Sequence, residues 1–217
     1  MRPERFERLR AALSRRQPDL TVLMDRVSKS HNFSAILRSC DATGVLEAHV
    51  VPPDTGLAIH RATSAGTKKW VSVRRHDEIA DAIRHLKGRG FTVIAAHPSP
   101  RSVDFRELDY TRPTAIVLGA ELHGVSHSGL TLSDHHVIVP MQGMVHSLNV
   151  SVATALVLFE AARQREAAGM YEESRLDGAT FRSRLFEWAY PSVARKRRRE
   201  GRPYPELTDD GQIVRDW

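Results

Sequence analysis

The sequence predicts an α/β fold built on a largely parallel sheet. Three short runs rich in β-branched residues each stop at a turn signal, which is typical of strands buried on both faces: FTVIAA (91–96), AIVLG (115–119) and VIVP (137–140). Patterns with helical spacing lie between such runs. In residues 77–87, for example, the apolar positions recur every three to four residues and share one side. Strands that alternate with helices indicate a parallel sheet.

The remaining patterns extend this alternation toward both ends. We expect further strands at 22–24, 49–52 and 70–73, and helices at 3–16, 34–43 and 149–168. The helix that follows Asn149 begins with VSVATALVLF, which is apolar nearly all round, so it should be deeply packed. We therefore divide the chain into a basic N-terminal helical extension (1–20), a central α/β domain (21–168) and a basic C-terminal extension (169–217).

Positive charge is concentrated near the two ends of the chain. The whole chain carries +6, while residues 1–20 carry +3 and residues 190–205 carry +5. This distribution favours an anionic partner that the terminal extensions grip, and nucleic acid is the obvious candidate. Charged tails without any such partner would give the same balance, so charge alone leaves both interpretations open.

Several common kinds of site are excluded by what the sequence lacks. A single cysteine, Cys40, cannot form a disulfide framework, and no histidine spacing fits a familiar zinc motif, so we expect no metal. No apolar run is long enough to span a membrane and no leader is evident, so a cytoplasmic protein is expected. The first strand is not followed by G-x-G-x-x-G. The segment GAELHGVS (119–126) carries Val125 where a phosphate-binding loop needs lysine.

Three segments have unusual patterns of polar residues. They are SHNFSAILRSCDATGV (30–45), IVLGAELHGVS (116–126) and VIVPMQGMVHSLNVSVATAL (137–156). Taken singly, each has an ordinary explanation: an Asn cap followed by a solvated helix arginine, a surface glutamate in a tight turn, and a capped helix start. Single motifs therefore do not establish a function.

In this order and spacing the three segments resemble the signature motifs of the SPOUT class of RNA methyltransferases. The closest likeness is to the TrmH branch, the tRNA guanosine 2′-O-methyltransferases. The resemblance covers about residues 20–165 in detail, and the basic ends also look like those of that branch. It implies a deep trefoil knot in the C-terminal part of the α/β domain, S-adenosylmethionine as methyl donor, and a homodimer whose site is completed across the interface.

The resemblance also implies which residues form the site. The residues expected to be catalytic are Asn32, Arg38, Glu121, Ser147 and Asn149. The loops of the knot are expected to bind the donor through His97, Leu118, Gly119, Val139, Met141 and Leu148. Phosphates of the RNA are expected to contact Arg8, Arg195, Lys196, Arg197, Arg198 and Arg199.

Two questions about the chemistry stay open at this point. Arg38 could take the proton of the ribose hydroxyl, or it could hold the neighbouring phosphate and stabilise the alkoxide; we favour the second, because arginine is a poor base. The expected substrate is the D-loop guanosine at the eighteenth position of tRNA. The alternatives are a methyltransferase acting on ribosomal RNA and a non-catalytic RNA-binding protein with the same fold.

Overall fold

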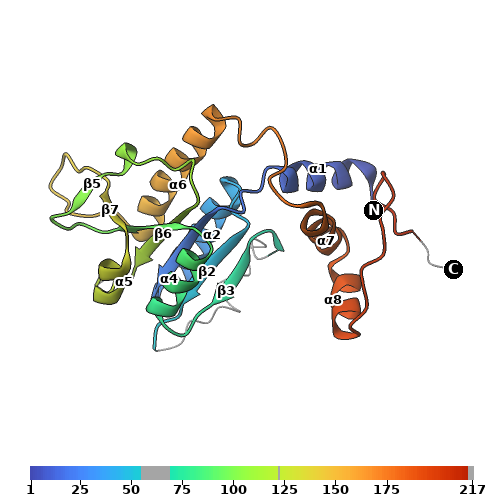
Figure 1. Cartoon of the computed structure of the whole chain (residues 1–217), viewed down its shortest axis with the longest axis horizontal. Helices are drawn as coiled ribbons and strands as arrows, with labels where there is room; N and C mark the ends of the chain where they lie inside the picture. Colours follow the sequence, from blue (N-terminus) through green and yellow to red (C-terminus); the bar gives the residue numbers. More distant parts are fainter. Residues whose placement is uncertain (55–68, 122, 215–217) are drawn as a thin grey trace. The chain divides into compact units, whose positions relative to one another are not determined.

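The computed structural model describes residues 1–54, 69–121 and 123–214, and the chain forms two compact units (Figure 1). One unit is Pro18–Ala168. The other combines Met1–Gln17 with Gly169–Trp217, so the two terminal segments, expected as separate extensions, pack into one body. In that body α1 (Pro3–Ser14) contacts α7 (Gly178–Ala189), and α7 contacts α8 (Pro191–Arg199).

The larger unit is built on a seven-stranded sheet in the order β3-β2-β1-β6-β4-β7-β5. All six neighbouring pairs run parallel, which confirms the predicted sheet. The trefoil knot stays a prediction. The strands are β1 (Leu20–Asp25), β2 (Glu47–Val51), β3 (Ser72–Arg75), β4 (Thr92–Ala96), β5 (Ser102–Asp104), β6 (Thr114–Gly119) and β7 (His135–Ile138).

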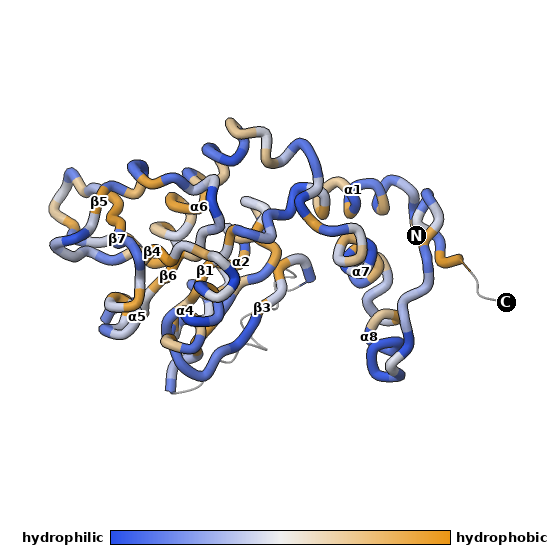
Figure 2. Tube along the Cα trace, in the orientation of Figure 1, coloured by the Kyte–Doolittle hydropathy of each residue, from blue (hydrophilic) through white to orange (hydrophobic). Residues whose placement is uncertain are grey.

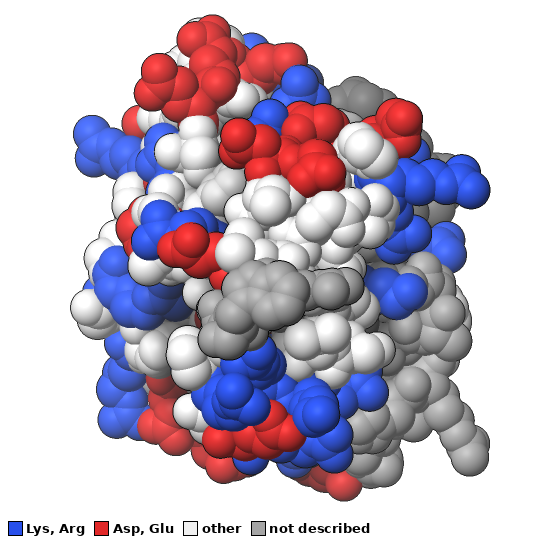
Figure 3. All heavy atoms as spheres, turned by 90° about the vertical axis from the view of Figure 1, so that its right-hand side faces the viewer, with Lys and Arg blue, Asp and Glu red and all other residues white. Residues whose placement is uncertain are grey.

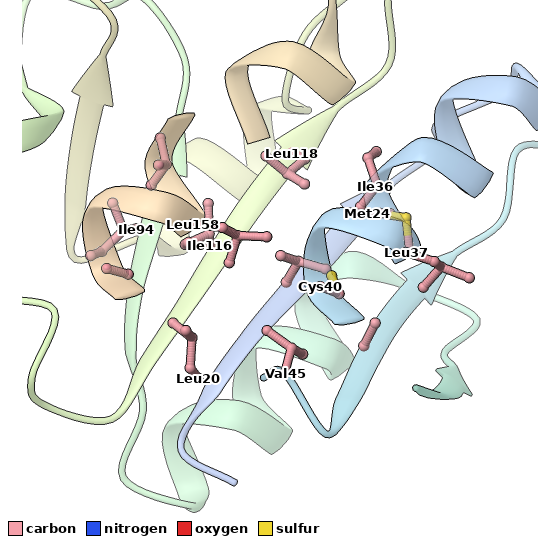
Figure 4. Close-up of a cluster of buried hydrophobic side chains, with 14 of the residues drawn as sticks. Leu20, Met24, Ile36, Leu37, Cys40, Val45, Ile94, Ile116, Leu118 and Leu158 are labelled. Carbon is pink, nitrogen blue, oxygen red and sulfur yellow. The ribbon is translucent and has the colours of Figure 1, made fainter. Parts of the chain in front are cut away.

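Helices cover both faces of this sheet, because side chains alternate along each strand. On one face α2 (Ser30–Ala42) and α6 (Val150–Ala167) enclose a core that includes Met24, Ile116 and Leu158 (Figure 4). On the other face α4 (Ile79–Gly88) and α5 (His127–Leu132) pack over a second cluster. The central strands are apolar along almost their whole length, as expected for strands buried on both sides (Figure 2).

The boundaries of several elements differ from the predicted ones. Helix α2 begins at Ser30, four residues before the expected start, so Asn32 lies in its first turn and is not its cap. The short β5 and α5 were not predicted, and runs of three and six residues are too short for periodicity to reveal. Helix α6 begins as expected, with Asn149 as its N-cap.

The side chain of Arg165 connects the C-terminal end of α6 to the segments that precede β1 and β6. The side chain of Arg165 is fully buried and its guanidinium donates 2.6 Å to Asp19 Oδ1 and 2.9 Å to the carbonyl of Tyr110. Because it also donates to the carbonyls of Asp19 and Arg112, the charge is well satisfied inside the fold.

No helix among the described residues is long and apolar enough to cross a membrane.

Three histidines cluster between the edge strands and α4. His49 Nδ1 lies 2.8 Å from His76 Nε2, and the His85 ring lies 5.8 Å from the ring of His49. Burial lowers the pKa of His49 from 6.5 to about 4; Glu47 opposes this shift, while His76 and His85 add to it. His49 is therefore neutral in the folded chain at neutral pH.

This cluster predicts that the fold loses stability in mild acid. The pKa of His49 is lower in the folded chain than in the unfolded chain. The contribution of neutral His49 to the free energy of unfolding is therefore fully present above pH 6.5 and is lost as pH falls toward 4. The free energy of unfolding should fall by up to about 3 kcal/mol over that window. Urea denaturation across the window measures it. His49→Gln should flatten the curve, whereas His31→Gln, which changes an exposed histidine, should not; equal slopes in wild type and His49→Gln would contradict the assignment.

Candidate active site

The three unusual segments meet at one edge of the sheet. All strands run parallel, so their carboxyl ends lie at the same edge, where parallel α/β sheets bind ligands. The first segment follows β1 and the second follows β6, and these two strands are neighbours. Asn32 comes from the first turn of α2, Glu121 from the loop after β6, and Asn149 from the start of α6.

Hydrogen bonds join these three side chains into one chain. Asn32 Nδ2 donates 2.7 Å to Glu121 Oε1, and Asn149 Nδ2 donates 3.1 Å to Asn32 Oδ1. The partners of Asn32 are 89 and 117 residues away in the sequence. Because Asn32 is 1% exposed, its amide needs such partners on both sides.

Both ends of this hydrogen-bond chain are anchored to backbone. Glu121 also accepts 3.2 Å from Ser28 Oγ and 3.4 Å from the Lys29 amide. At the other end Asn149 Oδ1 accepts 2.8 Å from the Ser151 amide and thereby caps α6. A carboxylate at one end and a backbone N–H at the other set the orientation of both amides between them. Ser28 and Ser151 were not singled out from the sequence, where they look like ordinary serines at helix starts.

The environment of Glu121 keeps it ionised. Burial raises the pKa of this carboxyl, but the hydrogen bonds from Asn32 and Ser28 outweigh it, and the net effect is a pKa below the ordinary value. Glu121 therefore acts as a hydrogen-bond acceptor at neutral pH.

The loop after β6 is too tight for side chains at two positions. A Cβ at Gly119 would lie 1.9 Å from the carbonyl carbon of Gly124, so the two ends of the loop touch. Gly124 has φ of +66°, and a Cβ there would lie 2.6 Å from His97 Nδ1. The ring of His97 thus lies directly against this backbone. Burial, with a contribution from nearby His136, lowers the pKa of His97 and favours the neutral ring.

The other residues expected at the donor site have varied surroundings. The Leu118 side chain is 1% exposed and belongs to the core between the sheet and the α2–α6 layer (Figure 4). Val139 packs against the edge of that core, whereas Met141 and Leu148 are half-buried on the segment between β7 and α6. Leu118 can therefore offer a ligand only its backbone groups, while Met141 and Leu148 retain accessible side chains.

Two of the five residues expected to be catalytic stand apart from the hydrogen-bond chain. Arg38 and Ser147 are both exposed, and neither side chain forms a hydrogen bond or ion pair with another residue that the structure describes. Arg38 lies six positions after Asn32 on α2, about 240° around the helix, so the two side chains point in different directions. One copy of the chain does not bring Arg38 to Asn32.

The basic residues of α8 differ in what they contact. Arg198 donates to Glu187 Oε1 at 2.5 Å and to the hydroxyl of Tyr204 at 3.1 Å, while its side chain stays 66% exposed. Arg195, Lys196 and Arg199 are exposed, Arg197 is half-buried, and Arg8 is exposed on α1. On the face drawn in Figure 3, basic side chains gather at the end of the unit where α8 lies.

Comparison with known proteins places this arrangement among the RNA methylases. Residues 19–159 match the SpoU rRNA Methylase family and residues 163–216 match the family's C-terminal part. A tRNA (guanosine(18)-2′-O)-methyltransferase of Escherichia coli is 50% identical over 218 residues, covering 100% of this chain and 95% of that protein.

Among the residues that the structure describes, no group of acidic, histidine or cysteine side chains could hold a metal.

Solved structures agree with the sequence matches. The crystal structure of an Aquifex aeolicus TrmH/SpoU tRNA modifying enzyme has a TM-score of 0.81 and 43% identity, covering 88% of this chain and 97% of that chain. The Streptomyces viridochromogenes SpoU methyltransferase AviRb, in complex with AdoMet, has a TM-score of 0.62 and 28% identity over 70% of this chain and 62% of that one.

The fold and the site define an α/β protein with a chain of hydrogen-bonded polar side chains at the carboxyl edge of a parallel sheet. The chain belongs to the SpoU methylase family. The resemblance to the TrmH branch of the SPOUT class that the motifs suggested is thereby confirmed.

The hydrogen-bond chain predicts a specific response to changes at Asn32. Asn32→Asp places a second carboxyl group against Glu121, so this variant should unfold more easily at pH 8 than at pH 5, where one carboxyl group takes up a proton. Asn32→Ala should cost about 1–3 kcal/mol at both pH values, because it leaves Glu121 without its amide donor. Urea denaturation at the two pH values measures both effects. His31→Ala, at an exposed neighbouring position, is the control, and an Asn32→Asp variant insensitive to pH would contradict this geometry.

Proposed function

We propose that this chain transfers a methyl group from S-adenosylmethionine to the ribose 2′-hydroxyl of the guanosine at position eighteen of tRNA. The observation that carries the proposal is the Glu121–Asn32–Asn149 chain, which unites all three signature motifs of the family at one edge of the sheet. The Escherichia coli relative, which this chain matches over its full length, is named for that reaction. A pure RNA-binding protein would have no need for this site.

The donor site is formed by the segments after β4, β6 and β7. The absence of side chains at Gly119 and Gly124 lets the loop after β6 fold back on itself and lie against His97, since a Cβ at either position would collide with these groups. His97, Val139, Met141 and Leu148 supply partly buried surface around the donor, and Leu118 contributes its backbone. A sulfonium methyl donor supplies an electrophilic carbon. The residues of the chain need only orient it and exclude water.

Arg38 acts on the acceptor RNA. Its guanidinium holds the phosphate beside the target ribose and stabilises the developing alkoxide, while the chain through Asn32 keeps α2 in place beneath it. Ser147 lies two residues before the N-cap of α6 and orders the donor segment there. The exposed basic residues of α1 and α8 hold RNA phosphates. Of that set, Arg198 is also paired with Glu187, so part of its charge is already balanced within the protein.

The working form is a homodimer formed through α6. Val152, Leu156 and Phe159 recur at spacings of four and three, so they line one stripe of this helix, and they are 48%, 40% and 56% exposed. Met144 and Val145, on the segment before α6, are also exposed, at 94% and 58%. Large exposed apolar side chains that share one helix stripe are typical of a subunit interface. Because Arg38 stands apart from Asn32 in one copy, the partner subunit completes the site.

The protein acts in the cytoplasm.

The reaction can be tested with tRNA and ribosomal RNA transcripts. The chain and S-adenosylmethionine should place one 2′-O-methyl group on tRNA, and mass mapping should locate it at the eighteenth nucleotide. Arg38→Ala should lower kcat by about 10²–10³-fold while the affinity for tRNA is kept. Arg38→Lys should lose most of the activity, because an ammonium lacks the planar fork. Methyl transfer to ribosomal RNA alone would overturn the choice of substrate, and full activity of Arg38→Lys would overturn the role given to the guanidinium.

The dimer can be tested by adding a charge to the apolar stripe. Phe159→Glu should convert the dimer into a monomer in analytical ultracentrifugation and abolish methyl transfer, because a carboxylate cannot be buried between two apolar helices. Val214→Glu is the matched control, since Val214 is 40% exposed and lies in the terminal unit. A dimeric Phe159→Glu variant would contradict the interface, and a monomeric wild-type chain would contradict the dimer.

A further inference from the structure

Polar side chains hold the segment that leaves the carboxyl end of β4. Ser102 Oγ donates 2.7 Å to the carbonyl of His97 and so closes the segment on itself. Ser102 Oγ also accepts 2.9 Å from the Ser99 amide, and the two serine oxygens lie 3.0 Å apart. These contacts use both serine hydroxyls and one backbone amide within six residues, so the segment is cross-linked by its own side chains.

The imidazole of His136 ties this segment to two other elements. His136 lies in β7 and is 6% exposed. Its Nδ1 is 2.7 Å from Ser99 Oγ, while its Nε2 is 3.0 Å from the carbonyl of Leu130 in α5 and 3.0 Å from the guanidinium of Arg101. One buried ring therefore joins β7, α5 and the segment after β4.

The hydrogen bonds can run in one direction through the whole network. If Arg101 donates to His136 Nε2, then Nδ1–H donates to Ser99 Oγ, and the Ser99 hydroxyl donates onward to Ser102. The Ser102 hydroxyl then donates to the carbonyl of His97. In the other tautomer, Nε2–H donates to Leu130 and the Ser99 hydroxyl donates to Nδ1, so Ser99 stays bonded to His136 in both.

The end of this network is in contact with the loop that carries Glu121. The His97 ring lies so close to Gly124 that a Cβ there would come within 2.6 Å of Nδ1. The Gly124 amide donates 2.8 Å to the carbonyl of Ala120, directly before Glu121. A shift of the β4 segment would therefore move His97 against the loop on which the donor site depends.

We propose that Ser99, Ser102 and His136 are positioning residues for the methyl donor, because they fix the segment after β4 against the loop after β6. None of the three is among the residues that the family motifs identify. They act on the donor through His97 and the backbone of that segment, not by contact with the reacting atoms. This inference rests on the proposed function, since it assigns these residues to the same donor site.

The test uses the full chain and measures donor binding separately from the other steps. Ser99→Ala should raise the Kd for S-adenosylmethionine in calorimetry by about 3- to 10-fold, the usual effect of losing one such hydrogen bond. The KM for the donor should rise in parallel, while kcat at saturating donor and the Kd for tRNA stay unchanged. Ser99→Thr, which keeps the hydroxyl, should restore the wild-type affinity.

Variants of His136 separate its two nitrogens. The side-chain amide of Asn reaches about where Nδ1 lies and that of Gln about where Nε2 lies. His136→Asn should therefore keep the bond to Ser99 and bind the donor better than His136→Gln does. Ser72→Ala is the matched control, because Ser72 Oγ also donates to a partly buried carbonyl, that of Leu46, but in β3. Melting temperatures of all variants report any general loss of stability.

The outcomes are distinct. A donor Kd that rises in Ser99→Ala but not in Ser72→Ala supports the inference. A donor Kd that changes equally in both, or that stays constant while the melting temperature falls, overturns it and leaves the proposed function intact. Failure of the wild-type chain to bind the donor overturns the proposed function itself, and the inference with it.

Discussion

The site depends on one carboxylate–amide–amide hydrogen-bond chain, from Glu121 through Asn32 to Asn149. Asn32 is buried on α2, where an unpaired side-chain amide would be costly. Its hydrogen bonds connect α2 to the loop after β6 and to the start of α6. Segments 89 and 117 residues distant are thereby fixed at one place. Without this chain the three motifs would still lie at the same edge of the sheet, but their relative positions would not be set.

The parallel sheet makes such a convergence possible. Because every strand pair is parallel, the segments that follow β1, β4, β6 and β7 all emerge at one edge. Tight backbone packing at Gly119 and Gly124 then brings the loop after β6 against His97, and the Ser99–Ser102–His136 network holds His97 from the other side. Rigid strands with short, cross-bonded loops suit a site that must orient a donor and an acceptor for in-line transfer.

The two units present different kinds of surface. The α/β unit carries the polar chain and an exposed apolar stripe on α6, which suits chemistry and self-association. The terminal unit carries the exposed basic residues of α1 and α8, which suit contacts with phosphates that do not depend on sequence. Within that unit the basic residues of α8 are not equivalent, since Arg198 is paired with Glu187.

The sequence by itself determined the alternation of strands and helices, the apolar start of α6 and the three motifs, because periodicity and turn residues are local properties of a chain. Only the tertiary structure decided that Asn32 joins Glu121 to Asn149 instead of capping α2, that Arg38 stands apart, and that Arg198 pairs with Glu187. It also revealed the contact between buried His49 and His76, and the short β5 and α5. These features depend on partners that are distant in sequence, and a local pattern carries no information about which distant residue will satisfy a buried polar group.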